Sequence, residues 1–153
     1  MSIFHSLNTS ASALTAQRLR MDVISSNMAN VETTRGKMVD GEWQPYRRKT
    51  VSFQPREGQF SSMLHAAMGS QGKDGTGNGV KVSSILEDSE TPFKLVYDPS
   101  HPDANDEGYV QMPNVDPLRE MIDLMSATRS YEANITVLNA NKAMLMKALE
   151  IGK

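Results

Sequence analysis

Two apolar stripes with a seven-residue period, one near each end of the chain, constrain this sequence most strongly. Large apolar residues recur at every seventh position in both stretches. The positions are Leu7, Leu14, Met21 and Met28 in the first stripe, and Leu124, Tyr131, Leu138 and Leu145 in the second. This period is typical of a helix that packs along its length against another helix. We therefore expect long N- and C-terminal helices that pack as a coiled-coil-like pair.

The faces of these helices that lie away from the stripes carry little charge. No Lys, Arg, Asp or Glu occurs from Ser2 to Gln17, or from Ala133 to Asn141. A helix that faces water normally carries charge on its outer side, whereas the centres of protein interfaces are depleted of charge. The Ser, Thr and Asn residues of the first segment also disfavour an isolated helix. We infer that other protein surrounds both helices and supplies their order.

Breaks in the helical pattern divide the chain into three regions. Residues 1–32 are expected to hold the N-terminal helix, and residues 113–153 the long C-terminal helix. Residues 33–112, where Gly, Pro and strand-forming residues are frequent, are expected to form a small β-rich insert with a flexible glycine-rich loop at 69–79. The predicted fold class is therefore mainly α with a small β-rich insert (α+β).

Local signals place elements within these regions. Pro117 suits the first turn of a helix, and either Asn114 or Asp116 can cap that helix. The expected elements are helices at Ile3–Val31 and Asp116–Glu150, one or two strands within Glu42–Phe53, strands at Val80–Leu86, Phe93–Tyr97 and Tyr109–Met112, and a short helical turn at Gln59–Met68.

Composition excludes several classes of protein. The absence of cysteine excludes disulfides, thiolate catalysis and cysteine metal sites. No apolar run approaches the roughly 20 residues that cross a bilayer, so no membrane insertion is expected. The start of the chain has neither a basic region nor a continuous apolar core, so no Sec signal peptide is expected. Basic and acidic residues are too dispersed for a nucleic-acid surface.

The glycine-rich stretch Gly69–Gly79 has a superficial likeness to a phosphate-binding loop. A Walker A loop needs a glycine where Ala67 stands, and Ser or Thr after Lys73, where Asp74 stands. No helix is expected to follow the stretch and bind an anion at its N-terminus. We interpret it as a flexible linker, and we expect no cofactor or small-molecule substrate.

Acidic residues and histidines do not form a metal-binding pattern either. Residues 103–108 partly match a calcium loop, but the twelfth position is Asn114, which cannot supply a bidentate carboxylate. His5, His65 and His101 have no second ligand at the usual spacing. No serine nucleophile elbow occurs. We therefore predict no metal site and no catalytic residues.

Two segments of the chain resemble signatures of the flagellar axial proteins, the family of rod, hook and hook-associated subunits. Ser26–Thr33 matches the motif S-N-x-A-N-x-x-T that closes the first helix of these proteins. Pro113–Asp116, followed by Glu120-Met121 and Ser130–Asn134, resembles the C-terminal signature of the rod branch. Segments in the middle, among them Leu95–Pro99, are similar to rod proteins in the same order. The likeness covers nearly the whole chain.

This resemblance implies a structural subunit of the bacterial flagellar basal-body rod. Members of the family leave the cell through the flagellar type III export apparatus and polymerise helically around a central channel. The resemblance therefore implies other rod proteins and further copies of the chain as partners. It also implies a place in the proximal rod, which transmits torque and encloses the export channel. The residues expected to pack between or within subunits are the eight stripe residues together with Asn27, Asn30 and Asn134.

Three alternatives remain open at the level of the sequence. A distal-rod or hook subunit belongs to the same family but usually carries a larger central domain. A cytoplasmic coiled-coil adaptor would carry charged residues beside its apolar seam, which the first half-helix lacks. An enzyme acting on the cell wall would need a carboxylate such as Glu107. The eleven methionines fit either an ordinary helix core or an interface that adapts to several surfaces.

Overall fold

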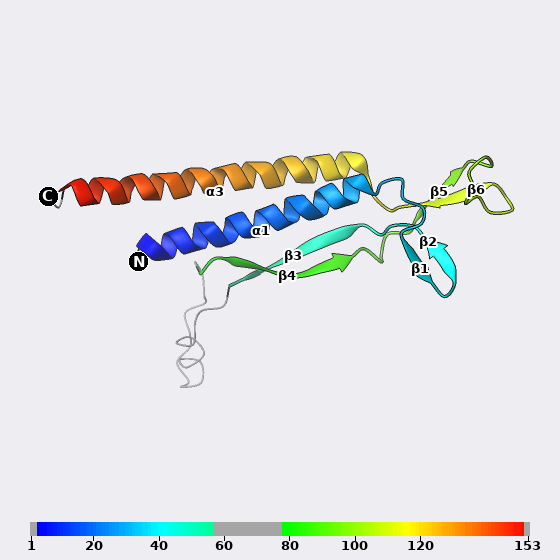
Figure 1. Cartoon of the computed structure of the whole chain (residues 1–153), viewed down its shortest axis with the longest axis horizontal. Coiled ribbons are helices and arrows are strands. Elements are labelled where there is room, and N and C mark those ends of the chain that lie inside the picture. Colours follow the sequence, from blue (N-terminus) through cyan, green and yellow to red (C-terminus); the bar gives the residue numbers. More distant parts are fainter. Residues whose placement is uncertain (1–2, 57–77, 152–153) are drawn as a thin grey trace, which may run out of the picture. The chain divides into compact units, whose positions relative to one another are not determined.

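Two long helices lie at the ends of the chain, with short strands between them in sequence. The computed structural model describes residues 3–56 and 78–151. Its elements are α1 (Ile3–Ala29), β1 (Lys37–Val39), β2 (Glu42–Gln44), β3 (Lys49–Pro55), β4 (Val80–Glu87), β5 (Lys94–Tyr97), β6 (Tyr109–Met112) and α3 (Pro117–Ile151) (Figure 1). The strands pair as β1–β2, β3–β4 and β5–β6. The predicted α+β class, with two terminal helices and a small β-rich insert, is confirmed at this level.

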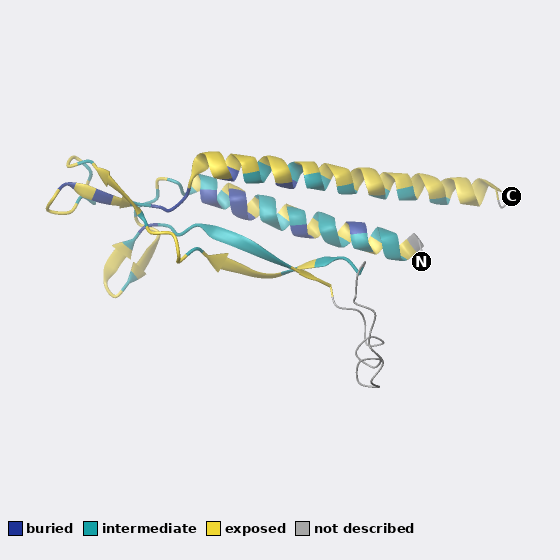
Figure 2. Ribbon diagram, turned by 180° about the vertical axis from the view of Figure 1, so that it is seen from behind, coloured by how far each residue is buried: buried dark blue, intermediate teal, exposed yellow. Residues whose placement is uncertain are grey.

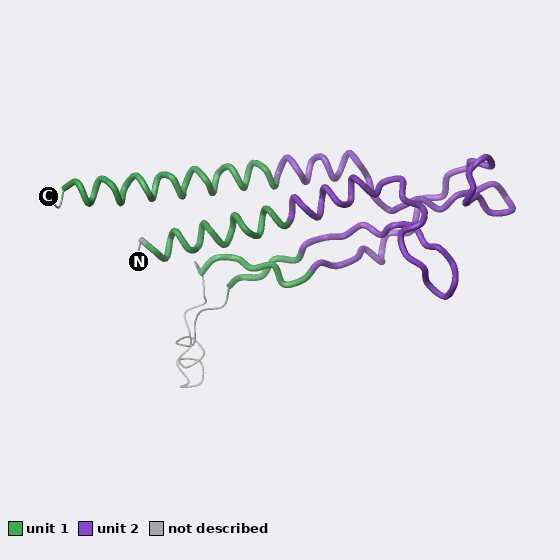
Figure 3. Tube along the Cα trace, in the orientation of Figure 1, with its two compact units in different colours: residues 1–19, 52–84, 127–153 green, residues 20–51, 85–126 purple. Residues whose placement is uncertain are grey.

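The chain forms two compact units, and each is assembled from separate stretches of sequence (Figure 3). Unit 1 comprises residues 1–19, 52–84 and 127–153, and unit 2 comprises residues 20–51 and 85–126. Both helices and the β3–β4 pair therefore contribute residues to each unit. The three-region division at 1–32, 33–112 and 113–153 stays a prediction.

The bounds of both helices agree closely with the sequence. α1 begins at the expected residue and ends two residues early, and α3 is displaced by a single residue at each end. The Asp116 carboxylate caps α3, because its Oδ1 accepts a hydrogen bond from the Leu118 N–H at 3.1 Å. The expected helical turn at Gln59–Met68 lies outside the described residues, as does nearly all of the glycine-rich loop 69–79.

Strand β1 was not predicted, although a hairpin signal was present. β1 and β2 pair antiparallel, with Met38 opposite Trp43. The connecting residues Asp40 and Gly41 both have positive φ, at 53° and 89°. This conformation belongs to the tight hairpin turn that Asp-Gly favours. The glycines and prolines of this region were interpreted only as breaks in the helical pattern, so the hairpin turn was not predicted.

The other strands lie close to the predicted ranges. β5 and β6 pair antiparallel, and the rings of Tyr97 and Tyr109 meet edge to face with centroids 5.3 Å apart. β3 and β4 also run antiparallel. The Asp88 N–H bonds the Arg48 carbonyl beyond one end of this pair, and the Arg56 N–H bonds the Gly79 carbonyl beyond the other.

Hydroxyl groups in the first half of α1 bond to the backbone of their own helix. Thr9 Oγ1 donates to the His5 carbonyl at 2.9 Å, Ser12 Oγ to the Thr9 carbonyl at 2.7 Å, and Thr15 Oγ1 to the Ala11 carbonyl at 3.1 Å. Such bonds explain how a segment of weak helical propensity presents a low-polarity surface. In unit 1, Ser12 Oγ also accepts the Val80 N–H, which ties the start of β4 to α1.

The buried core is small for a chain of this length (Figure 2). Its apolar members among the described residues are Ala16, Val23, Ile24, Val110, Val115 and Ala127. Most large apolar side chains of α3 remain substantially exposed. Within the part of the chain that the structure describes, no helix has both the length and the apolar character needed to cross a membrane.

Gly79 provides a test of the packing between β4 and α1. A Cβ atom at Gly79 would lie 2.3 Å from Ser12 Oγ, and its φ is +94°, whereas Gly41 has a similar φ of +89° in open space. Gly41→Ala should therefore cost only the backbone strain, about 1–2 kcal/mol. Gly79→Ala should cost about 1–3 kcal/mol more, because the methyl group also displaces Ser12. Urea unfolding of both variants measures the difference, and equal losses would contradict this packing.

Candidate functional site

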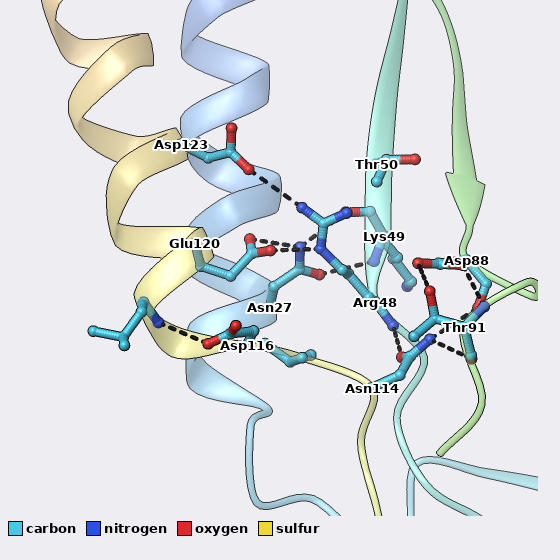
Figure 4. Close-up of polar contacts among 12 residues, drawn as sticks. Asn27, Arg48, Lys49, Thr50, Asp88, Thr91, Asn114, Asp116, Glu120 and Asp123 are labelled. Atoms are coloured by element: carbon cyan, nitrogen blue, oxygen red, sulfur yellow. Dashed lines mark hydrogen bonds and ion pairs between the residues drawn. The ribbon is translucent and has the colours of Figure 1, made fainter. Parts of the chain in front are cut away.

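A cluster of buried polar side chains joins four segments of unit 2, and we call it the polar clasp. Its members are Asn27 of α1, Arg48 just before β3, Asn114 just before α3, and Glu120 in the first turn of α3 (Figure 4). Asn27, Arg48 and the stretch that holds Asn114 and Glu120 are far apart in the sequence, yet hydrogen bonds connect them. The clasp therefore fixes the ends of both helices to the strand region within this unit.

An ion pair lies at the centre of the polar clasp. Arg48 Nε donates to Glu120 Oε1 at 2.6 Å, and Asn27 Nδ2 donates to Glu120 Oε2 at 3.0 Å. The Glu120 side chain is 0% exposed and that of Arg48 only 11%. Removing two charges from water carries a large desolvation cost, which only good geometry and further hydrogen bonds offset. Both carboxylate oxygens of Glu120 have such a partner.

Asn27 uses its full hydrogen-bonding capacity. Besides donating to Glu120, Nδ2 donates to the Lys49 carbonyl at 2.8 Å. Its Oδ1 accepts from the Lys49 N–H at 2.9 Å and from the Tyr46 hydroxyl at 3.0 Å. An amide offers two donors and two acceptor sites, and all four are used here. Neither aspartate nor leucine, which are similar in size to asparagine, matches this arrangement, because it needs donors and acceptors together.

A second carboxylate extends the cluster toward solvent. Asp123 accepts from Arg48 Nη2 at 3.3 Å and from Arg20 Nη2 at 2.9 Å, and both Asp123 and Arg20 are partly exposed. Asn27 on α1 bonds Glu120 on α3. Arg20, which comes seven residues before Asn27 on α1, bonds Asp123, which comes three residues after Glu120 on α3. In unit 2, α1 and α3 therefore run antiparallel.

Asn114 connects the loop that precedes α3 to two other segments. Its Oδ1 accepts from the Arg48 N–H at 2.8 Å, and its Nδ2 donates to the carbonyls of Asp88 and Thr91 at 3.0 and 3.1 Å. The Thr91 N–H and hydroxyl in turn donate to the Asp88 carboxylate, which lowers the pKa of Asp88. Asn114 was considered as a helix cap in the sequence analysis, but its side chain bonds the strand region instead.

The end of α1 is closed by the remaining motif residues. Asn30 Nδ2 donates to the Ser26 carbonyl at 2.8 Å, and Thr33 Oγ1 donates to Asn30 Oδ1 at 3.2 Å. The Tyr46 N–H then bonds the Thr33 carbonyl at 3.1 Å. The motif S-N-x-A-N-x-x-T therefore has a local structural role, since it ends the helix and directs the chain toward β2.

The acidic loop that follows β5 binds cationic and polar groups of the same chain. Thr34 Oγ1 and Arg35 Nε each donate to the Asp103 carboxylate at 2.8 Å. The bond from Arg35, more than that from Thr34, lowers the pKa of Asp103. Asp103 was weighed above as part of a calcium loop. Among the described residues, no group of three or more His, Cys, Asp or Glu side chains is arranged to hold a metal ion.

The structure places the predicted packing residues in different environments. All eight stripe residues, from Leu7 to Leu145, are half-buried. Asn134 Nδ2 donates to the Ser130 carbonyl of its own helix, as Asn30 does to that of Ser26. Asn27 belongs to the polar clasp. A role of these residues in contacts between subunits stays a prediction.

The sequence analysis gave no role to the two charged residues of the clasp. Arg48 was not singled out at all, and Glu120 was named only as part of a motif. A signal for Glu120 existed, because Glu120, Leu124 and Tyr131 follow one another at spacings of four and seven and so share a helix face. A charged residue on an apolar face predicts a buried partner. The partner itself could not be found without the fold.

Comparisons with known proteins agree on one family. Residues 7–36 match the family model described as flagella basal body rod protein, and residues 106–151 match the model described as flagellar basal body rod FlgEFG protein C-terminal. The chain is 67% identical to the flagellar basal-body rod protein FlgC of Bacillus subtilis, over 100% of both chains. It is 46% identical to the protein of that name from Salmonella typhimurium, over 100% of both chains. The corresponding protein of Borreliella burgdorferi is 45% identical, over 99% of this chain and 98% of its own length.

Neutralising Glu120 tests the weight of the buried ion pair. Glu120→Gln preserves the shape of the side chain but removes the buried charge opposite Arg48 and leaves it only the longer, partly exposed pair with Asp123 at 3.3 Å. The loss of the buried charge should lower the free energy of unfolding by up to about 3–5 kcal/mol. Glu150→Gln is the matched control, because it breaks the exposed 2.8 Å pair with Lys147 and should cost less than about 1 kcal/mol. Urea unfolding compares the two variants. An equal decrease in the free energy of unfolding in both variants would show that the buried pair stabilises the fold no more than the exposed pair does.

The lowered pKa of Asp88 predicts that acid loosens its turn. A carboxylate whose folded pKa lies below its ordinary value stabilises the fold at neutral pH, and it loses this contribution as the pH falls through the folded pKa. The amide of Thr91 should therefore become less protected from hydrogen exchange toward low pH. In Asp88→Asn this dependence should disappear. If the protection of the Thr91 amide in the unmodified chain does not change with pH, the proposed role of the Asp88 carboxylate is contradicted.

Proposed function

Because the chain belongs to the FlgC family of flagellar basal-body rod proteins, we propose that it polymerises helically through α1 and α3 into part of the proximal rod. The family consists of structural rod proteins and not of enzymes. The chain is accordingly a structural subunit of the basal body. The observation that carries this conclusion is identity of 45% or more to FlgC proteins of three distant bacteria over practically the whole length.

The distribution of apolar side chains supports assembly through the helices. The described residues bury few apolar side chains, whereas many large ones on α3 remain exposed. Covering one large apolar side chain contributes about 1.5–3 kcal/mol, compared with about 0.2–0.5 kcal/mol for an exposed ion pair on a helix. We propose that neighbouring subunits cover these side chains and that apolar contacts dominate the cohesion of the rod. The coiled-coil-like pairing of the stripes belongs to this proposal.

The polar clasp has a mechanical role in this proposal. The buried Arg48–Glu120 pair and the saturated Asn27 hold both helices against β3 through directional bonds in unit 2. Directional polar networks fix one geometry more strictly than apolar contacts do. We propose that the clasp keeps the helices in register with the β-rich insert while the rod transmits torque. The helices themselves would enclose the export channel.

The proposed partners are further copies of this chain, other rod proteins and the flagellar type III export apparatus. Contacts in which one face meets a different face of the next copy extend into a helix instead of closing as a dimer. An export route that unfolds the chain suits helices whose order depends on neighbours. The chain would therefore reach the basal body unfolded and gain its final order on incorporation.

Replacing Leu138 tests assembly through the stripe. Leu138 is half-buried on α3 and its neighbour Asn139 is exposed. Leu138→Asp places a charge in the proposed seam and should abolish incorporation into the rod and motility, while export continues. Asn139→Asp introduces the same charge one position along and should leave assembly intact. The measurements are immunoblots of isolated basal bodies and of secreted protein from cells that carry each variant as the sole copy.

The outcome that contradicts the proposal is clear. Normal rods and motility with Leu138→Asp would remove the stripe from the assembly mechanism. Absence of the unmodified chain from basal bodies would remove the structural role itself.

A further inference from the structure

α3 carries a second apolar stripe that the seven-residue pattern did not include, and we call it the outer stripe. It consists of Leu118, Met121, Ile122 and Met125, whose exposed fractions are 72%, 50%, 64% and 54%. Spacings of three and four place them on one side of the helix. Glu120, which is buried, lies on the opposite side of α3 in unit 2. Contiguous apolar surface of this kind marks a site of interaction with another protein.

In the same unit, α1 presents an exposed surface of small and acidic side chains, and we call it the α1 outer face. Asp22, Ser25 and Ala29 are exposed and follow one another at spacings of three and four, and Glu32 comes just after the end of the helix. Small side chains at Ser25 and Ala29 allow another helix to approach closely. The large side chains of the outer stripe would fill the space that these small ones leave, as knobs fill holes in helix packing.

Charges on the two surfaces are complementary. Two carboxylates border the α1 outer face, at Asp22 and Glu32, and the exposed Arg119 lies beside the outer stripe. Arg129 follows in α3 ten residues after Arg119, which equals the separation of Asp22 from Glu32. Among the described residues, other charged side chains form ion pairs, but none of these four does. Matched charges at the border of apolar surfaces set partner choice and register.

We infer that the outer stripe of one copy of this chain docks on the α1 outer face of a second copy. This inference rests on the proposed function, because copies in a helical assembly share one direction along it. α1 and α3 run antiparallel in unit 2, so α3 of one copy meets α1 of the next antiparallel. Counting along both helices with Ala29 opposite Ile122 places Asp22 opposite Arg129, and Glu32, just beyond the end of α1, then lies toward Arg119.

The contact joins two different faces and therefore propagates. Each copy presents its outer stripe to one neighbour and its α1 outer face to another, so every added copy creates a new docking site. A symmetric dimer would instead use the same face twice. The outer stripe thus adds a second contact between copies to the proposed seam, on residues distinct from the stripe that the sequence pattern predicts.

Disulfide trapping tests this contact directly, because the chain has no native cysteine. Cells would carry two differently tagged copies as their only source of the protein, one with Ala29→Cys and the other with Ile122→Cys. Mild oxidation of isolated basal bodies should link the two tags in a mixed dimer. Arg18→Cys replaces Ala29→Cys in the control, because it is exposed on the same helix but eleven residues out of register. The control should give at least tenfold less mixed dimer.

Exchanging the charges gives a second and independent measurement. Glu32→Arg and Arg119→Glu should each reduce the amount of the chain in basal bodies at least tenfold, since each brings like charges together. The double variant restores the pair with reversed sign and should recover most of the lost incorporation. This measurement decides the inference if the cysteine variants fail to assemble.

The results separate this inference from the proposed function. Normal incorporation of both cysteine variants without a mixed dimer overturns the inference and leaves the rod role intact. Failure of the double charge variant to recover also overturns it. If the Arg18→Cys control gives as much mixed dimer as Ala29→Cys, the contact is non-specific, and the register with Ala29 opposite Ile122 is overturned. Absence of the unmodified chain from basal bodies is the separate failure of the proposed function.

Discussion

The buried pair between Arg48 and Glu120 is the interaction on which the order of unit 2 depends. It joins residues that are 72 positions apart, and it places one charge where water does not reach it and the other where little water does. Such a pair is tolerated only when its remaining polar atoms are satisfied, and Asn27 satisfies the second carboxylate oxygen while it also binds both backbone groups of Lys49. The ends of α1 and α3 and the start of β3 therefore depend on one another.

A directional polar junction and a small apolar core form a consistent combination in a rod subunit. A protein that completed its own core would leave no apolar surface for its neighbours. Here the outer stripe and much of the remaining α3 surface stay exposed, while the hydroxyls of α1 bond their own backbone and keep its surface weakly polar. Polar bonds fix the geometry of the subunit, and apolar surface is left for assembly.

The sequence anticipated most elements because their signals are local. The periods of α1 and α3 and the cap at Asp116 depend on residues within one or two turns, so the helix bounds agreed to within two residues. β1 was missed although Asp40-Gly41 is a local hairpin signal, because the glycines of this region were interpreted only as breaks in the helical pattern. Asn27 was singled out from the sequence as a packing residue, but its place beside a buried ion pair was not predicted, since nothing local indicates that Arg48 is the partner of Glu120.

The sequence by itself determined two long helices, a β-rich insert between them and membership of a rod-forming family. Periodicity and motifs can be recognised without knowledge of the fold. Only the tertiary structure decided which helix faces turn inward. A heptad pattern shows which residues share a side of a helix, but it does not show whether that side meets the same chain or another one. The clasp settles this for unit 2, because the burial of Asn27 and Glu120 turns Ala29 and Ile122 toward the solvent.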